Sequence, residues 1–162
     1  MRTWTEISSP IGPLTCVVEN GLLIRVAMKD QAHLPDPSTF GDPGGLDPQI
    51  EQQLREYFAG GRTVFDLPLA PSGTDFQREV WSSLEEIPYG TTTTYGALAE
   101  KIGRPRAVRA LGLAVGRNPL SVIVPCHRVL GAGGSLTGYA GGLDRKRWLL
   151  NLEQPEIDWA TR

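Results

Sequence analysis

We predict a mixed α/β chain of two parts, an α/β unit over residues 1–73 and a mainly α unit over residues 74–162. Three runs rich in β-forming residues occupy the first part, and short amphipathic segments separated by glycine and proline occupy the second. Between the two parts, Ala70-Pro71-Ser72-Gly73 has the composition of a linker. The pattern therefore predicts a sheet with a helix, followed by a group of short helices.

The strands predicted for the first part cover residues 2–8, 13–19 and 22–28. Asn20-Gly21 separates the last two strands and favours the type I′ turn of a tight hairpin. Residues 29–45 are rich in Pro, Gly and Asp without periodicity, so we predict a loop there, with His33 on its surface. Residues 65–69 favour a further edge strand.

One helix is predicted within the first part. Asp47-Pro48 supplies an N-cap followed by a proline suited to the first turn, and Gly60-Gly61 ends the helix. Its apolar residues recur at helical spacing: Ile50, Leu54, Tyr57 and Phe58.

The second part begins with a capping box. Thr74 and Gln77 have the required spacing, so we predict a helix with Phe76, Val80, Trp81 and Leu84 on its buried face. A later helix, from Leu143 to about Leu152, is predicted to turn Trp148, Leu149 and Leu152 towards the core. Residues 131–135 favour a hairpin turn before a glycine-rich segment.

Between these helices, the sequence favours a helix-turn-helix. Thr94 is a plausible cap for a helix ending near Ile102, and a second helix is predicted from Pro105 to Gly116. Gly103 lies in the tight turn that would join them. This organisation is typical of DNA-binding proteins.

A cysteine and a histidine stand side by side after a short apolar run. Ser121 to Val124 favours a buried strand that delivers Cys126 and His127, and the chain holds only two residues of each type. A thiol beside an imidazole is a nucleophile beside a base, although a structural buried cysteine is the open alternative. In an extended chain the two side chains would point to opposite sides, so a bridging water is needed to join them.

Two carboxylates could orient that histidine, Glu153 and Asp144. The other cysteine, Cys16, lies inside a predicted strand and is expected to be a small core residue. The spacing of the cysteines and histidines matches no metal site, and we predict neither a metal nor a cofactor. With no signal-peptide pattern and no apolar run long enough to span a bilayer, we expect a soluble, cytoplasmic protein.

Charge is distributed unevenly. Residues 1–75 carry five Lys and Arg against ten Asp and Glu, whereas residues 76–162 carry eleven against eight. Five basic residues and no acid lie between Lys101 and Arg117. A solvated helix face and an anion-binding surface both remain open as explanations.

The motifs around the cysteine resemble those of the O6-alkylguanine-DNA alkyltransferase family. The resemblance is carried by Arg109-Ala110-Leu111-Gly112, Asn118-Pro119, Pro125-Cys126-His127-Arg128 and Gly138-Tyr139-Ala140-Gly141-Gly142, with weaker agreement at Ser9 to Leu14. It covers roughly Thr74 to Glu153, about half of the chain. It implies a ribonuclease H-like α/β domain followed by a winged helix-turn-helix domain.

The resemblance also implies the chemistry. Cys126 would take the alkyl group from O6 of guanine permanently, and we expect the same for O4 of thymine. His127 would act as a water-mediated base oriented by Glu153, and Asn118 would brace the turn before the cysteine. Tyr95 would press on a phosphate and help to protonate the departing guanine, while Arg109 would fill the gap left by the flipped nucleotide.

Other residues complete the implied site. DNA contacts are expected from Thr94, Tyr95, Arg104, Arg106, Arg109, Ala110 and Gly112, and the base pocket from Ser121, Val129, Tyr139 and Ala140. The implied partner is duplex DNA containing O6-alkylguanine, bound by a monomer, with cooperative binding left open. Serine at position 121, where some members have proline, puts acceptance of bulky adducts in doubt.

Two functions of other classes are alternatives. A non-enzymatic sensor of alkylated DNA would have the cysteine replaced, so Cys126 argues against it. A Cys-His hydrolase of the papain type normally takes its histidine from far along the chain, so adjacent residues argue against that function too.

Overall fold

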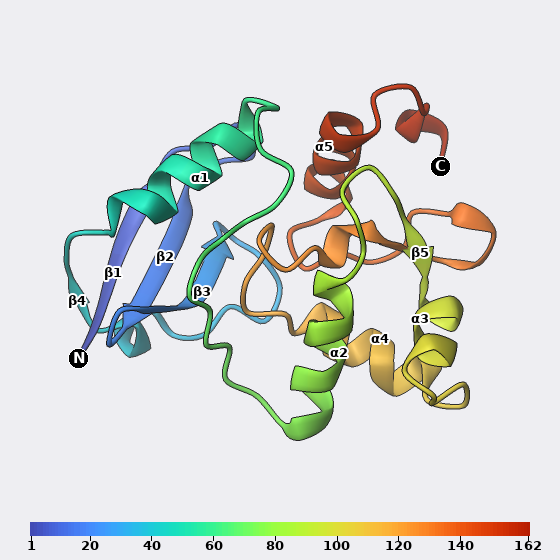
Figure 1. Ribbon diagram of the computed structural model, residues 1–162, viewed down its shortest axis with the longest axis horizontal. Helices are drawn as coiled ribbons and strands as arrows, with labels where there is room; N and C mark the ends of the chain where they lie inside the picture. Colours follow the sequence, from blue (N-terminus) through green and yellow to red (C-terminus); the bar gives the residue numbers. More distant parts are fainter. The chain divides into compact units, whose positions relative to one another are not determined.

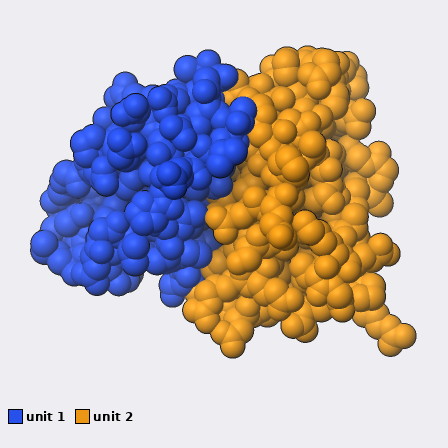
Figure 2. Space-filling view, in the orientation of Figure 1, with its two compact units in different colours: residues 1–72, 119–123 blue, residues 73–118, 124–162 orange.

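The computed structural model describes every residue from Met1 to Arg162, and the chain has a mixed α/β fold (Figure 1). It forms two compact units (Figure 2). Unit 1 comprises Met1–Ser72 and Pro119–Ile123, and unit 2 comprises Gly73–Asn118 and Val124–Arg162. The sequence indicated a division after Gly73 but not the return of residues 119–123 to unit 1, because pairing of so short a segment leaves no periodic signal.

Unit 1 contains a four-stranded sheet with the order β3-β2-β1-β4. Its strands are β1 (Arg2–Ile7), β2 (Leu14–Glu19), β3 (Leu22–Met28) and β4 (Asp42–Pro43). The first three pair antiparallel, and β4 pairs parallel with β1. Asn20 and Gly21 both have positive φ, at 52° and 81°, as a type I′ turn requires. The three predicted strands are therefore confirmed to within a residue.

Helix α1 (Pro48–Phe58) lies beside this sheet (Figure 1). The Asp47 carboxylate accepts a hydrogen bond from the Gln49 backbone N–H, so the predicted cap is present. Ile50, Leu54 and Tyr57 are buried, as their spacing predicted. Burial raises the pKa of Cys16 to about 12, with the charge of Glu51 adding to the effect, which leaves an unreactive core thiol.

Two predictions for unit 1 were wrong. Within the predicted loop 29–45, the chain forms β4 after a 3₁₀ turn, and a β-carbon at Gly41 would lie 2.0 Å from the Arg2 carbonyl oxygen. Strand propensities of the residues do not predict such a close approach of two backbone segments. Conversely, residues 65–69 form no strand, and only Leu69 bridges to Leu23. His33 is exposed, as expected.

The predicted strand at Ser121 to Val124 is also absent. The Val26 N–H donates to the Pro119 carbonyl (2.9 Å) and the Ser121 N–H donates to the Val26 carbonyl (3.3 Å). The chain then folds into a γ-turn in which the Ile123 N–H donates to the Ser121 carbonyl (2.8 Å), and Val122 has a φ of 73°. That φ is strained for a β-branched residue. The apolar run predicted burial correctly but not backbone conformation.

Unit 2 consists of helices around a small two-stranded sheet (Figure 1). The helices are α2 (Asp75–Glu85), α3 (Tyr95–Lys101), α4 (Val108–Gly116) and α5 (Leu143–Glu153), and the parallel strands are β5 (Thr93–Thr94) and β6 (Val129–Leu130). Both bonds of the capping box between Thr74 and Gln77 are present, and Thr94 caps α3 as predicted. No helix has the length and apolar character needed to cross a bilayer.

Helices α2 and α4 pack together around Val80, Leu84, Leu111 and Val115, which are buried. The Trp81 indole N–H donates to the Ala114 carbonyl (2.9 Å). The predicted helix start at Pro105 was wrong, because Ala107 N–H bonds to the Arg104 carbonyl (2.9 Å) and makes a turn that delays α4 to Val108.

Helix α5 buries only part of the predicted face, since Leu149 is buried as predicted and Trp148 and Leu152 are not. Lys146, Leu149, Leu150 and Glu153 are buried, while Trp148 and Leu152 are half-buried. Polar residues on the buried face weakened the apolar periodicity from which the prediction was made. At residues 131–135, where a hairpin turn was predicted, the Gly131 N–H donates to the Ser135 carbonyl (2.9 Å), and Ala132–Gly134 between them form a 3₁₀ turn.

Candidate active site

Cys126, the predicted nucleophile, lies in a 3₁₀ turn, Cys126–Arg128, instead of the predicted extended strand. Pro125 has φ and ψ of −81° and 64°, and the Cys126 N–H donates to the Val124 carbonyl (2.8 Å), so a second γ-turn leads into it. Cys126, His127 and Arg128 are 6%, 0% and 7% exposed. The alternation of side chains expected for a strand therefore does not apply to Cys126 and His127.

His127 is held by one carboxylate. Its Nε2 lies 2.7 Å from Oε2 of Glu153, and its Nδ1 is buried without a hydrogen-bond partner. Because an ionised carboxylate can only accept, Nε2 carries the proton and Nδ1 keeps its lone pair. Burial lowers the pKa of His127, and the opposing influence of Glu153 does not reverse this. The imidazole is therefore neutral and can accept a proton at Nδ1.

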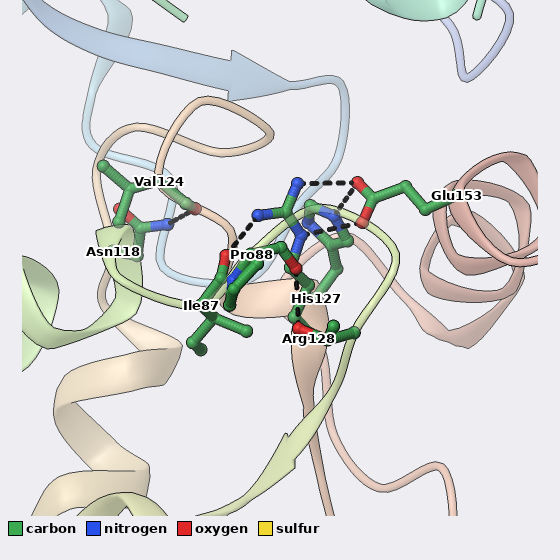
Figure 3. Close-up of polar contacts among 8 residues, drawn as sticks. Ile87, Pro88, Asn118, Val124, His127, Arg128 and Glu153 are labelled. Atoms are coloured by element: carbon green, nitrogen blue, oxygen red, sulfur yellow. Dashed lines mark hydrogen bonds and ion pairs between the residues drawn. The ribbon is translucent and has the colours of Figure 1, made fainter. Parts of the chain in front are cut away.

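Arg128 keeps Glu153 ionised. Burial alone would raise the pKa of Glu153, but its contacts with His127 and Arg128 lower that pKa to about 2. Since His127 is neutral, the lasting positive charge comes from Arg128, whose Nε and Nη2 bind the two carboxylate oxygens at 2.7 and 3.1 Å (Figure 3). Its Nη1 donates to the Ile87 carbonyl (2.6 Å), and the guanidinium lies 5.6 Å from the Tyr89 ring centre.

The thiol of Cys126 is neutral at rest. Burial raises its pKa, and a hydrogen bond from Asn118 and the charge of Lys146 oppose this only partly. The Asn118 amide also donates to the Val124 carbonyl (2.8 Å), two residues before the cysteine (Figure 3). Asn118 thus contacts both the thiol and the turn that presents it.

Two tyrosines lie beside the thiol. The Tyr139 hydroxyl is buried, and burial first and the charge of the nearby Cys126 second raise the pKa of this tyrosine. Tyr95, at the start of α3, is half-buried and close enough for the charge of Cys126 to raise its pKa, after burial as the larger cause. The predicted residues Asn118, Cys126, Tyr95 and Tyr139 therefore meet in unit 2.

The remaining pocket residues are less closely grouped. Val129 is fully buried in β6, directly after the 3₁₀ turn, and Ala140 is half-buried beside Tyr139 in the chain. Ser121 is buried in unit 1. Asp144, the rival to Glu153, is exposed and pairs with Arg147 instead.

Sequence reasoning assigned no role to Lys146 or Arg128. Lys146 is completely buried, and burial lowers its pKa to about 8. No sequence signal would have found Lys146, because lysine normally lies on the surface. Arg128 belongs to the motif Pro125-Cys126-His127-Arg128, so its position beside the cysteine was the available signal.

The basic run divides into two groups. Lys101 and Arg104 pair with Glu86 and Glu79 of the α2 region at 3.4 and 3.0 Å. Arg106, Arg109 and Arg117 are exposed and make no ion pair. The second group keeps its charge available for an anion, which favours the anion-binding explanation of the run.

The predicted contact residues of α3 and α4 also lie around Tyr95. Thr94 precedes it as the cap of α3, and Ala110 is exposed on α4 beside Arg109 in the chain. A β-carbon placed at Gly112 would lie 3.9 Å from the Tyr95 ring, so α4 closely approaches this tyrosine. No three His, Cys, Asp or Glu side chains lie where they could share a metal ion.

A known domain corresponds to the part of the chain that holds this geometry. The family model for the 6-O-methylguanine DNA methyltransferase, DNA binding domain, matches residues 75–155. A methylated-DNA–protein-cysteine methyltransferase of Mycobacterium tuberculosis is 51% identical over 155 residues, which cover 95% of this chain and 93% of the relative. The chain belongs to the 6-O-methylguanine DNA methyltransferase family.

Further relatives agree with this assignment. A methyltransferase of the same name from Methanosarcina acetivorans is 51% identical over 90% of this chain and 94% of its own length. The solved structure of Mycobacterium tuberculosis OGT in complex with DNA has a TM-score of 0.89 and 47% identity, and the match covers 96% of this chain and 94% of that chain. Family membership thus extends over both units.

Proposed function

We propose that this chain repairs alkylated duplex DNA by moving an alkyl group, principally methyl, from O6 of guanine to the sulfur of Cys126. The observation that carries the proposal is the buried Cys126 beside a neutral His127 whose Nδ1 has no partner and whose Nε2 is fixed by Glu153. The relatives named methylated-DNA–protein-cysteine methyltransferases support the same reaction. Transfer to O4-alkylthymine is proposed as a second, weaker activity of the same thiol.

The reaction begins with removal of the thiol proton. Nδ1 of His127 takes it through one water, while Glu153 stabilises the imidazolium that forms. The sulfur bonds to the alkyl carbon as the carbon–O6 bond breaks, and the electron pair of that bond stays on guanine. Tyr95 gives a proton to the departing guanine; the imidazolium of His127 then releases its proton to water, and a proton taken from water restores the phenol. Because nothing removes the thioether, each molecule acts once.

Burial of the thiol has a consequence for selectivity. Since the pKa of Cys126 is raised and that of His127 lowered, the thiolate–imidazolium pair is disfavoured in the resting protein. Proton transfer is then coupled to the presence of an electrophile placed in line with the sulfur. Such a thiol resists oxidation and adventitious alkylation until a damaged base arrives.

The target base must leave the helix to reach this thiol. We propose that α3 and α4 form the helix-turn-helix of a winged domain, and that Arg109 fills the vacancy while Arg106 and Thr94 contact the backbone. Extrusion of a base costs a few kcal/mol, less for a damaged base that pairs poorly. The α/β unit at residues 1–73 is proposed to have a ribonuclease H-like topology, with residues 74–162 as the alkyl-acceptor domain.

A titration tests the proposal. Protein is mixed in increasing ratio with duplex DNA carrying one radiolabelled O6-methylguanine, and label on the protein is counted. We expect one label per protein molecule, none in Cys126→Ser, and full labelling in the matched control Cys16→Ser. Cys126→Ser should still bind the duplex. Tight lesion binding without label on the wild-type protein would overturn the proposal in favour of a lesion sensor.

A further inference from the structure

Thr137, in the glycine-rich segment before α5, is held at three points. Its carbonyl accepts a hydrogen bond from Nζ of Lys146 (3.0 Å), and its hydroxyl is hydrogen-bonded to the phenol of Tyr95. Its side chain also packs on Gly131, where an added β-carbon would lie 2.9 Å from Cγ2 and 3.1 Å from Oγ1. We propose that Thr137 is a positioning residue that holds the Tyr95 phenol for proton delivery to the departing guanine.

Lys146 anchors the backbone of this contact. Its buried Nζ donates to the carbonyls of Val129 (2.7 Å), Thr137 (3.0 Å) and Gly138 (3.3 Å), so all three hydrogens of the ammonium are used. The neighbouring Gly138 has a φ of 33° and adds little stiffness of its own. The lysine therefore ties a flexible sequence to β6 at the point where Thr137 faces Tyr95.

The side chain of Thr137 packs closely against Gly131. A branched β-carbon leaves few χ1 choices, and the side chain of Thr137 fills the space that a side chain at position 131 would need. Branching at Cβ and the contact with Gly131 limit the conformations in which the exposed Thr137 side chain presents its hydroxyl to Tyr95. A preorganised contact of this kind costs no further ordering when the substrate binds.

The direction of the hydrogen bond suits the chemistry. Burial and the charge of Cys126 raise the pKa of Tyr95, whereas Thr137 lowers it, as expected if the threonine hydroxyl donates to the phenol oxygen. The phenol proton then remains available for the guanine. After Tyr95 has released that proton, the same bond stabilises the phenolate until water reprotonates it.

This inference rests on the proposed role of Tyr95, so the test separates the two. Single-turnover methyl transfer from duplex DNA is measured for wild type, Thr137→Val, Thr137→Ser, Tyr95→Phe and the double variant Thr137→Val with Tyr95→Phe. Valine keeps the shape and loses the hydroxyl, and serine keeps the hydroxyl. Loss of one hydrogen bond to a developing charge predicts roughly tenfold slower transfer for Thr137→Val.

Four results together support the inference. Thr137→Ser transfers within about twofold of wild type, and the double variant is no slower than Tyr95→Phe alone. DNA affinity and the thermal unfolding midpoint of Thr137→Val stay unchanged, and the matched control Thr161→Val, an exposed threonine whose hydroxyl binds the Asp158 carbonyl, transfers at the wild-type rate.

Other results overturn it in distinguishable ways. If Tyr95→Phe transfers the methyl group slowly and Thr137→Val transfers it at the wild-type rate, Thr137 has no positioning role and the proposed function of Tyr95 stands. A fast Tyr95→Phe removes both. If Thr137→Val and Thr137→Ser slow transfer equally, the effect comes from the shape of the segment and not from the hydroxyl. If the slowing in the double variant equals the product of the slowing in the two single variants, Thr137 and Tyr95 act independently.

Discussion

Arg128→Met removes the permanent cation from the buried network behind the catalytic histidine. In the wild type, Arg128 binds both oxygens of Glu153 and the Ile87 carbonyl. His127 first and Arg128 second lower the pKa of Glu153 from 4.5 to about 2, so Arg128 supplies only part of the about 3 kcal/mol of stability at neutral pH to which this lowering corresponds. Leaving a buried carboxylate unpaired typically costs roughly 3–5 kcal/mol, so we expect a loss of that size.

The loss should depend on pH. The native pKa of Glu153 lies below its ordinary value of 4.5, so its stabilisation is fully present above about pH 4.5 and disappears as the pH falls towards about 2. In the variant, burial favours the neutral carboxyl of Glu153. At low pH this carboxyl is protonated, so the cost of an unpaired buried carboxylate disappears. The stability difference between wild type and variant should therefore shrink as the pH is lowered.

Urea unfolding at a series of pH values between neutral and about pH 3 measures this difference. Arg78→Met is the matched control, because Arg78 forms an exposed ion pair with Asp75 at 2.6 Å and such pairs contribute little. The reasoning would be refuted if Arg128→Met were as stable as wild type at neutral pH, or if its loss were the same at every pH.

Three further predictions concern single residues. Arg109→Ala should slow repair of duplex DNA at least about tenfold more than it slows the reaction with free O6-methylguanine base. The reason is that Arg109 acts only where the flipped nucleotide leaves a gap in the DNA helix. Equal losses in the two reactions would exclude that role. Because burial raises the pKa of Cys126, the native protein should show no thiolate absorbance from this thiol at about pH 7. A thiolate absorbance that is present in the wild type and absent in Cys126→Ser would contradict this prediction. The pKa of Lys146 falls to about 8 on folding, so between pH 8 and 10.5 the unfolded chain binds a proton that the folded chain does not. Relative to Lys146→Met, the free energy of unfolding of the wild type should therefore rise by about 3 kcal/mol over this pH range. Urea unfolding that shows no such rise would contradict the low pKa of Lys146.

Local signals in the sequence were sufficient for much of the fold. The caps at Asp47, Thr74 and Thr94 were predicted because a capping side chain and its backbone partner lie within three residues of each other. The turn at Asn20-Gly21 was predicted for the same reason, since the two residues alone satisfy the positive φ values.

Features that depend on distant partners were not predictable in this way. Ser121 to Val124 were expected to form a strand, but pairing with Val26 and the γ-turn at Val122 decide their conformation. Burial of Lys146 depends on three carbonyls that the sequence places 8 to 17 residues away. Such contacts become visible only when the chain is folded.

The candidate site shows the same contrast. The adjacency of Cys126 and His127 is a property of the sequence, but the 3₁₀ turn that directs their side chains is not. The residues alone left Glu153 and Asp144 open, the family resemblance implied Glu153, and the structure places Glu153 against His127 and Asp144 against Arg147. Thr137 was missed because its interaction with Tyr95 joins segments that carry no shared motif.

Intact mass spectrometry after reaction with excess duplex containing one O6-methylguanine tests the central claim most directly. The account predicts a mass gain of one methyl group per protein, never more, located by peptide mapping on the peptide that contains Cys126 and absent from the peptide that contains Cys16. A methyl group on any other residue, repeated turnover without a mass gain, or an unchanged mass in protein that binds the lesion would contradict it.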